Sequence, residues 1–291
     1  MDVGRYARGA KTSSDVRNRI DNCFARLRSE KRKGFIAYIC AGDPNLETTV
    51  DLVSTLEKAG ADLIELGIPF SDPLADGIVN QLAAQRALSA GATVRGVLDY
   101  VRQIRRDSQI PIVLYTYLNP VFQFGLVKFH REAEVVGVDG LLILDLPPEE
   151  DNDVELASSQ LDIGRDADAT NVIHVRLIAP TTPPQRIEKI AAEAKGFLYY
   201  VSREGVTGAH DTVASSLAAK VAQLRKLSDL PIAVGFGIST ADQAREVARY
   251  ADAVVVGSVI VDLIAKHGSK TDLLAKVGSF ANELAEAVKS V

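Results

Sequence analysis

The sequence predicts an α/β protein: a single (β/α)8 TIM barrel with an extra helix at each end. Short β-branched runs alternate with amphipathic stretches along the 291 residues, which predicts right-handed βαβ units on a parallel sheet. Eight such runs occur with no break in composition, and α/β barrels reach this length as one domain. An open doubly wound sheet is the alternative, but no G-x-G-x-x-G follows the first run.

Strands and helices are expected to alternate along the chain. Each expected strand is a short apolar run, and each helix between strands has apolar residues spaced three and four apart. The eight expected strands are 34–40, 62–67, 111–116, 139–145, 172–178, 197–201, 231–235 and 252–256. The expected helical stretches between them are 46–59, 83–106, 123–136, 183–194, 213–227 and 240–250.

The two extra helices lie at the ends of the chain. An amphipathic stretch at about 15–30 predicts a helix that plugs the bottom of the barrel or packs on its flank. A second helix is expected over 271–290. Residues 1–14 are polar and basic with no apolar run, which excludes a secretory signal and indicates a flexible arm, with an organelle transit peptide as the alternative. No linker divides residues 15–291, which are expected to form one catalytic domain.

Composition excludes several classes of function. A net charge of −5 and a pI near 5.5 argue against nucleic acid or an anionic membrane as a partner. No apolar run of about 18 residues occurs, so no membrane-spanning helix is expected. Cys23 and Cys40 form no C-x-x-C pair, which indicates reduced thiols in a cytoplasmic protein. The four histidines show no metal-ligand spacing, so no metal is expected.

The most informative stretch is 63–77, an apolar strand followed by a proline-rich loop. Glu65 shares one face of the strand with Leu63 and Gly67, and it lies in an apolar interior if both faces are covered. A buried carboxylate is costly unless it is paired or its pKa rises enough to keep the proton. Glu65 is therefore a candidate catalytic acid, and Asp76 at the end of the loop is a second one. The alternative is a structural glutamate satisfied by a lysine or a backbone N–H.

Three glycine-containing turns follow the late strands, at 205–208, 235–239 and 257–258. Glycine lets the backbone approach a ligand closely, and successive N–H groups can converge on an anion. Gly257 and Ser258 also begin a helix, whose N-terminus favours a phosphate. Because barrels commonly bind phosphate after strands seven and eight, a phosphate site is expected here. Ordinary turn glycines are the alternative.

These motifs resemble the α subunit of tryptophan synthase over about residues 18–268. The match at 65–77 is specific, because both acids, both prolines and both glycines fall in register, whereas the glycine turns are shared with other phosphate-binding barrels. The matching pieces are NRID (18–21), AGDP (41–44), ELGIPFSDPLADG (65–77), DLP (145–147), APTT (179–182), SREGVTG (202–208), GFGIS (235–239) and GS (257–258).

The resemblance implies a carbon–carbon lyase that splits indole-3-glycerol phosphate into indole and glyceraldehyde 3-phosphate by retro-aldol cleavage. Glu65 would shuttle the proton, and Asp76 would accept the indole N–H and stabilise charge on the ring. The substrate-binding residues implied are Tyr117, Tyr199, Thr207 and Phe236, with simple core packing as the alternative for the aromatic residues. Gly208, Gly237, Gly257 and Ser258 would hold the phosphate. Asp43 and Thr207 would join two loops in a lid over the substrate.

The resemblance also implies a partner, a pyridoxal-phosphate β subunit in an α2β2 tetramer that would receive the indole. Asp72 and Pro73 would contact it, and this chain would need no cofactor of its own. Ile78 replaces the proline that usually follows Gly77, which is expected to loosen the loop that carries Asp76. A stand-alone lyase and a catalytically silent, phosphate-binding regulatory barrel remain as alternatives.

Overall fold

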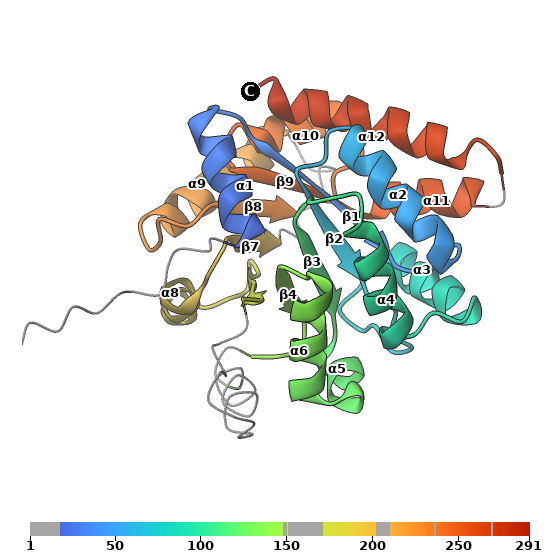
Figure 1. The fold of residues 1–291 in the computed structure, drawn as a ribbon. Coiled ribbons are helices and arrows are strands. Elements are labelled where there is room, and N and C mark those ends of the chain that lie inside the picture. The colour runs from blue at the N-terminus through green and yellow to red at the C-terminus, as the bar shows by residue number, and fades with distance from the viewer. Residues whose placement is uncertain (1–17, 148–149, 151–170, 202–209, 236, 269) are drawn as a thin grey trace, which may run out of the picture.

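The computed structural model describes residues 18–147, 150, 171–201, 210–235, 237–268 and 270–291 (Figure 1). Its strands form one parallel sheet in the order β5-β4-β3-β2-β1-β9-β8-β7-β6. The bounds are β1 Gly34–Cys40, β2 Leu63–Gly67, β3 Ile112–Thr116, β4 Gly140–Ile143, β5 Ile173–His174, β6 Arg176–Ile178, β7 Leu198–Val201, β8 Ile232–Gly235 and β9 Ala253–Val256.

The two ends of this sheet order are consecutive pieces of one strand, so the barrel closes on itself. β5 pairs with β4 and β6 pairs with β7. Between them, the Val175 N–H donates to the Leu141 carbonyl at 2.8 Å. The single expected strand over 172–178 is therefore two short segments, and the predicted barrel is confirmed.

The helices cover the outside of the barrel (Figure 1). Their apolar faces meet the outward residues of the strands in the larger hydrophobic core, as the 3.6-residue periodicity predicts. The bounds are α1 Arg19–Ser29, α2 Leu46–Lys58, α3 Ile78–Ser89, α4 Val94–Ile104, α5 Leu118–Phe124, α6 Leu126–Val136, α8 Pro184–Glu193, α9 His210–Arg225, α10 Ala241–Ala248, α11 Ser258–His267 and α12 Leu273–Lys289.

Glycine divides two of the expected helical stretches. The stretch 83–106 is two helices, because Gly91 adopts a φ of 87° between them and the Thr93 side chain caps α4 by accepting from the Gly96 N–H. The stretch 123–136 spans the end of α5 and all of α6, which meet at Gly125 with a φ of 97°. The prediction of one continuous stretch was wrong in both places.

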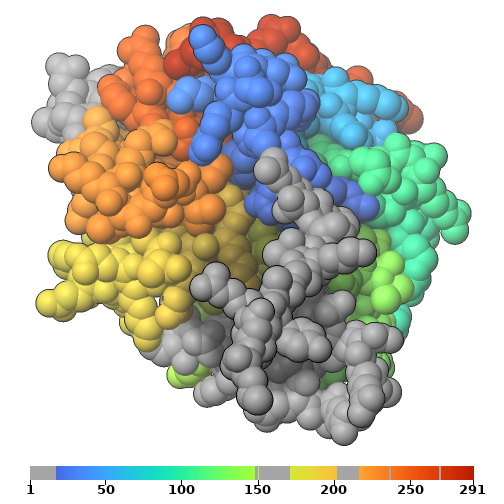
Figure 2. All heavy atoms as spheres, turned by 60° about the vertical axis from the view of Figure 1, so that its left-hand side comes forward, coloured from blue at the N-terminus to red at the C-terminus, as the bar shows by residue number. Residues whose placement is uncertain are grey.

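The helix α1 closes the amino-terminal end of the barrel. Its buried face packs on inward residues at the starts of the strands, among them Leu63, Phe197 and Ala253. Figure 2 shows the blue segment that contains α1 lying against both the orange and the cyan and green parts of the chain. Packing on the flank is therefore excluded, and the plug is confirmed.

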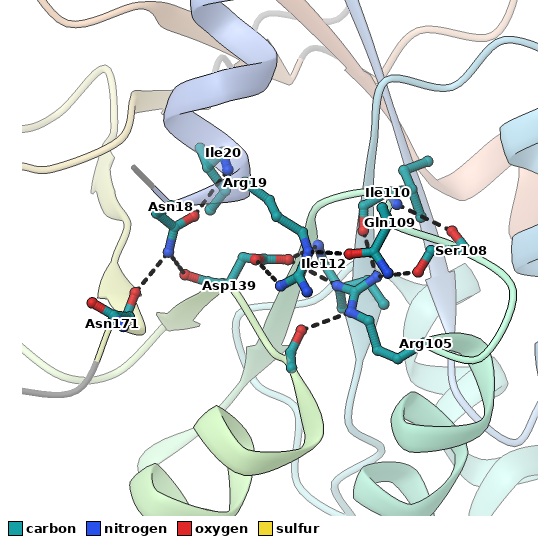
Figure 3. Close-up of polar contacts among 11 residues, drawn as sticks. Asn18, Arg19, Ile20, Arg105, Ser108, Gln109, Ile110, Ile112, Asp139 and Asn171 are labelled. Atoms are coloured by element: carbon teal, nitrogen blue, oxygen red, sulfur yellow. Dashed lines mark hydrogen bonds and ion pairs between the residues drawn. The ribbon is translucent and has the colours of Figure 1, made fainter. Parts of the chain in front are cut away.

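A polar network fixes the start of α1 (Figure 3). The Asn18 side chain accepts from the Ile20 N–H and donates to the carbonyls of Asp139 and Asn171. The Asp139 carboxylate accepts from Arg19, from Arg105 and from the Ile112 N–H. The N-cap of α1 is thereby tied to the first residues of β3 and β4.

The helix α12 lies across α2, α10 and α11 (Figure 1). Leu273, Val277 and Leu284 are buried on its inner face, and the helix expected over 271–290 is confirmed. Within the described ranges, no helix has both the length and the apolar content needed to cross a membrane.

Candidate active site

The site lies inside the barrel, at the carboxyl ends of the strands. A cavity of about 890 Å³ opens there. Its walls come from lumen-facing positions of the strands and from the loops that follow them. The residues that line it include Tyr38, Glu65, Asp76, Tyr115, Tyr199, Gly235, Gly237, Gly257 and Ser258.

Glu65 projects into this cavity from the middle of β2. It pairs in register with Tyr38 on β1 and Val113 on β3, and it is only 3% exposed. No group in the described part of the chain donates a hydrogen bond to its carboxyl, and neither a lysine nor a backbone N–H satisfies it there. Burial, and secondarily the charge of Asp76, raises the pKa of Glu65 to about 8. The side chain therefore holds a proton at neutral pH.

Asp76 lies on the loop between β2 and α3 and is held by two tyrosines from β3 and its end. The Tyr115 hydroxyl donates to Oδ1 at 2.8 Å, and the Tyr117 hydroxyl donates to Oδ2 at 2.8 Å. Burial, and then interaction with Asp76, raises the pKa of both phenols, so each stays protonated and able to donate. The start of α3 two residues later favours a negative charge at this point.

Two further tyrosines fill space that glycines leave on neighbouring strands. A Cβ at Gly235 would lie 2.8 Å from the Tyr199 hydroxyl, and one at Gly67 would lie 2.6 Å from the Tyr38 hydroxyl. Burial, followed by the charge of Glu65, raises the pKa of Tyr199. Tyr199 therefore lies close to the acid and lines the cavity, and its expected part in substrate binding stays a prediction.

The glycine-rich end of the cavity contains three of the four expected phosphate residues. Gly237, Gly257 and Ser258 all line it, and Gly237 adopts a φ of 61° that favours glycine. Ser258 is the first residue of α11, so the N-terminus of this helix faces the cavity wall. Gly208, Thr207 and Phe236 lie outside the described residues.

Asp43 is buried behind the cavity. Its two carboxylate oxygens accept from Arg86 on α3 at 2.9 and 2.7 Å. This bidentate pair joins the loop after β1 to the helix that follows Asp76. Its expected part in a lid with Thr207 stays a prediction.

The two expected partner residues lie on the loop at the mouth of the cavity. Asp72 is exposed and Pro73 is half-buried. Leu74 next to them is 83% exposed, and Ile78 at the start of α3 is 65% exposed. Large apolar side chains therefore project to solvent beside the cavity.

The sequence analysis missed Tyr115 and Arg86. Tyr115 had a usable signal, because Tyr117 directly follows β3 in an extended conformation and residues two apart in extended chain face the same side. Arg86 had none, since a helix-surface arginine gives no indication of a carboxylate forty-three residues away.

No metal site is seen in the ranges that the structure describes, where no three side chains of histidine, cysteine, aspartate or glutamate form a group that could hold an ion. Cys23 and Cys40 are both free and buried.

This fold and this cavity define a (β/α)8-barrel protein with a candidate enzyme site at the carboxyl ends of its strands. The model of the tryptophan synthase alpha chain family matches residues 24–289. The chain belongs to this family.

Similar proteins carry the same description. The tryptophan synthase alpha chain of Opitutus terrae is 49% identical over 273 residues, which cover 94% of this chain and 99% of that protein. The crystal structure of tryptophan synthase subunit alpha from Legionella pneumophila superposes with a TM-score of 0.84 at 37% identity and covers 95% of this chain and all of that one. A chain of the ligand-free tryptophan synthase from M. tuberculosis superposes with a TM-score of 0.80 at 29% identity, with 94% of this chain and all of that chain covered.

Proposed function

We propose that this chain is the α subunit of a tryptophan synthase and splits indole-3-glycerol phosphate into indole and glyceraldehyde 3-phosphate. The observation that carries the proposal is the protonated, buried Glu65, which shares one cavity with Asp76 and with the glycine-lined end of the barrel. Family membership supports the same reaction.

Glu65 acts as the acid and then the base of the cleavage. Its proton goes to C3 of the indole ring, which makes the ring a leaving group. The C3′ hydroxyl then loses its proton to the Glu65 carboxylate and becomes the aldehyde of glyceraldehyde 3-phosphate. The electron pair of the broken C3–C3′ bond stays with the indole, and Glu65 ends in its starting protonation state.

Asp76 accepts the indole N–H and stabilises the positive charge that develops on the ring. The aromatic residues Tyr117, Tyr199 and Phe236 line the indole pocket. The phosphate binds at the glycine turns Gly208, Gly237, Gly257 and Ser258, where N–H groups and the α11 dipole favour an anion. Thr207 and Asp43 join their two loops when substrate is bound.

The partner is a β subunit that contains pyridoxal phosphate, in an α2β2 tetramer, and this chain uses no cofactor of its own. The exposed apolar side chains at the mouth of the cavity, Leu74 and Ile78, support a docking surface there together with Asp72 and Pro73. Structures of the M. tuberculosis tryptophan synthase include an aminoacrylate-bound form.

Residues 15–291 form one catalytic domain in this proposal, and residues 1–14 form an arm outside it. Two free thiols are typical of a reducing compartment, and we place the protein in the cytoplasm.

The test is an assay of indole release from indole-3-glycerol phosphate by the purified chain, with and without a β subunit. We expect slow release by the chain alone and a large acceleration by the β subunit. Equally fast release without the β subunit would identify a stand-alone lyase. Binding of the substrate with no indole under either condition would identify a silent, ligand-binding barrel and overturn the proposal.

A further inference from the structure

Tyr115 is a cavity residue that the reaction outlined above does not use. It lies on β3, and Tyr117, which directly follows the strand in an extended conformation, faces the same side. Each of the two phenols donates to a different oxygen of Asp76, and both distances are 2.8 Å. The carboxylate is thus held at both oxygens by groups that belong to the barrel wall.

This arrangement orients a half-buried side chain on an otherwise exposed loop. The loop on which it lies is largely open to solvent, as Leu74 beside it shows. The Tyr115 ring is fixed in turn by an edge contact with Tyr38, with 5.1 Å between centroids and 70° between ring planes. A side chain on an open loop is therefore oriented by a half-buried ring that is packed against Tyr38.

The Tyr117 hydroxyl forms hydrogen bonds both with Asp76 and with the backbone of its loop. The Tyr117 hydroxyl accepts from the Ala75 N–H at 3.0 Å while it donates to Asp76. Within the described residues, the Tyr115 hydroxyl makes no hydrogen bond with the loop backbone, so it acts on the carboxylate alone. Removing that hydroxyl tests the orientation of Asp76 without detaching the loop.

We propose that Tyr115 is a positioning residue that fixes the Asp76 carboxylate toward the cavity, so that one lone pair stays aimed at the indole N–H. This inference rests on the proposed function, because it assigns Asp76 the indole N–H. Asn80 supplies only a long contact of 3.5 Å to the same oxygen, and it does not replace the phenol.

The test compares Tyr115→Phe with Tyr100→Phe in the complex with a β subunit. Tyr100 is the matched control, because its hydroxyl also binds a carboxylate, that of Glu47 at 2.8 Å, on the outer surface. We expect Y115F to lower kcat for indole release about ten- to a hundredfold with little change in KM, as for the loss of a hydrogen bond to a charged group. We expect Y100F to stay within about twofold of wild type, and thermal unfolding checks that both variants fold.

A double-mutant comparison separates positioning from packing. In the D76N background, Y115F should cost less than about twofold, because its target is already altered. An equal loss in both backgrounds overturns the proposal.

A binding assay keeps this inference separate from the proposed function. The chain contains no tryptophan, so indole fluorescence reports only the added ligand. If wild type releases no indole, the proposed function fails. The inference about Tyr115 is then tested by comparing the affinity of the protein for indole with its affinity for 1-methylindole, which lacks the N–H. The inference is supported if wild type and Y100F bind indole more tightly than 1-methylindole and Y115F does not. No preference in wild type, or one that Y115F retains, overturns it.

Discussion

Glu65 and Asp76 show how surroundings separate two carboxylates that share one cavity. Glu65 has no hydrogen-bond donor among the described residues and holds its proton to about pH 8, whereas Asp76 accepts from two phenols. A group that must give and take a proton is best placed near neutral pKa, and a group that stabilises positive charge is best kept ionised. The two environments match the two proposed roles.

Glu65→Gln should abolish indole release while the barrel stays folded. Glutamine keeps the shape of the side chain but has no proton to transfer, and loss of a general acid–base group costs about 10²–10⁴-fold or more. The measurement is indole release with the β subunit present, together with the circular dichroism spectrum. Appreciable residual activity in a folded E65Q protein would remove Glu65 from its role.

Asp76→Asn should lower kcat at least about a hundredfold, because an amide cannot balance the charge that develops on the indole ring. KM should change much less, since the charge exists only in the transition state. Steady-state kinetics on indole-3-glycerol phosphate decide this. A variant that loses substrate affinity but keeps kcat would assign Asp76 to binding only.

At the scale of elements, local patterns predicted the strands well and the divisions between helices poorly. All eight strand positions are confirmed, because apolar runs bounded by turns reflect burial on both faces. The break between α3 and α4 depends on the backbone angle of Gly91, and an isolated glycine inside an apolar stretch does not reveal that angle.

The candidate site was predicted mainly from one stretch, 63–77. The hydrogen bond from Tyr115 to Asp76 could not be predicted, because this contact joins a strand to a loop thirty-nine residues away.

Three aspartates at the amino-terminal end of the barrel make the same pair of contacts, one with a backbone N–H and one with an arginine. Each directly precedes a strand, and its carboxylate accepts from the N–H at the start of a neighbouring strand: Asp62 from Phe35, Asp139 from Ile112 and Asp252 from Ile232. Each also pairs with an arginine, respectively Arg26, Arg105 and Arg225. These contacts fix strand starts far from the cavity.

Asp139→Ala should destabilise the protein by about 3–5 kcal/mol. The substitution leaves the buried Arg105 guanidinium and the Ile112 N–H without this acceptor (Figure 3). Asp99→Ala is the matched control, because Asp99 pairs with Arg102 on an exposed helix face, where the loss should be below about 1 kcal/mol. Urea unfolding measures both. Equal effects would show that the Asp139 network contributes no more than a surface pair.

At the scale of the whole molecule, the buried acid lowers stability in alkaline solution. The folded-state pKa of Glu65, about 8, lies above the ordinary value of 4.5, so the folded protein binds one more proton than the unfolded chain between these values. Stability from this group is therefore lost as pH rises from about 4.5 to 8.

Glu65→Gln should accordingly stabilise the fold at pH 8 relative to wild type, by on the order of 4 kcal/mol, with the difference shrinking toward pH 4.5. Urea midpoints across this pH range for wild type, E65Q and the exposed control Glu283→Gln measure the effect. A constant offset between E65Q and wild type would show that the native Glu65 ionises with an ordinary pKa.

The plug formed by α1 has a consequence for how the chain reaches its native state. Its apolar side chains meet Phe197 and Ala253, which the ribosome makes more than a hundred and fifty residues later. During synthesis this helix emerges early, while much of the surface that covers it does not yet exist. Docking of α1 is therefore a late step of folding. Until then, a newly made chain exposes the apolar face of this helix, which chaperones can recognise.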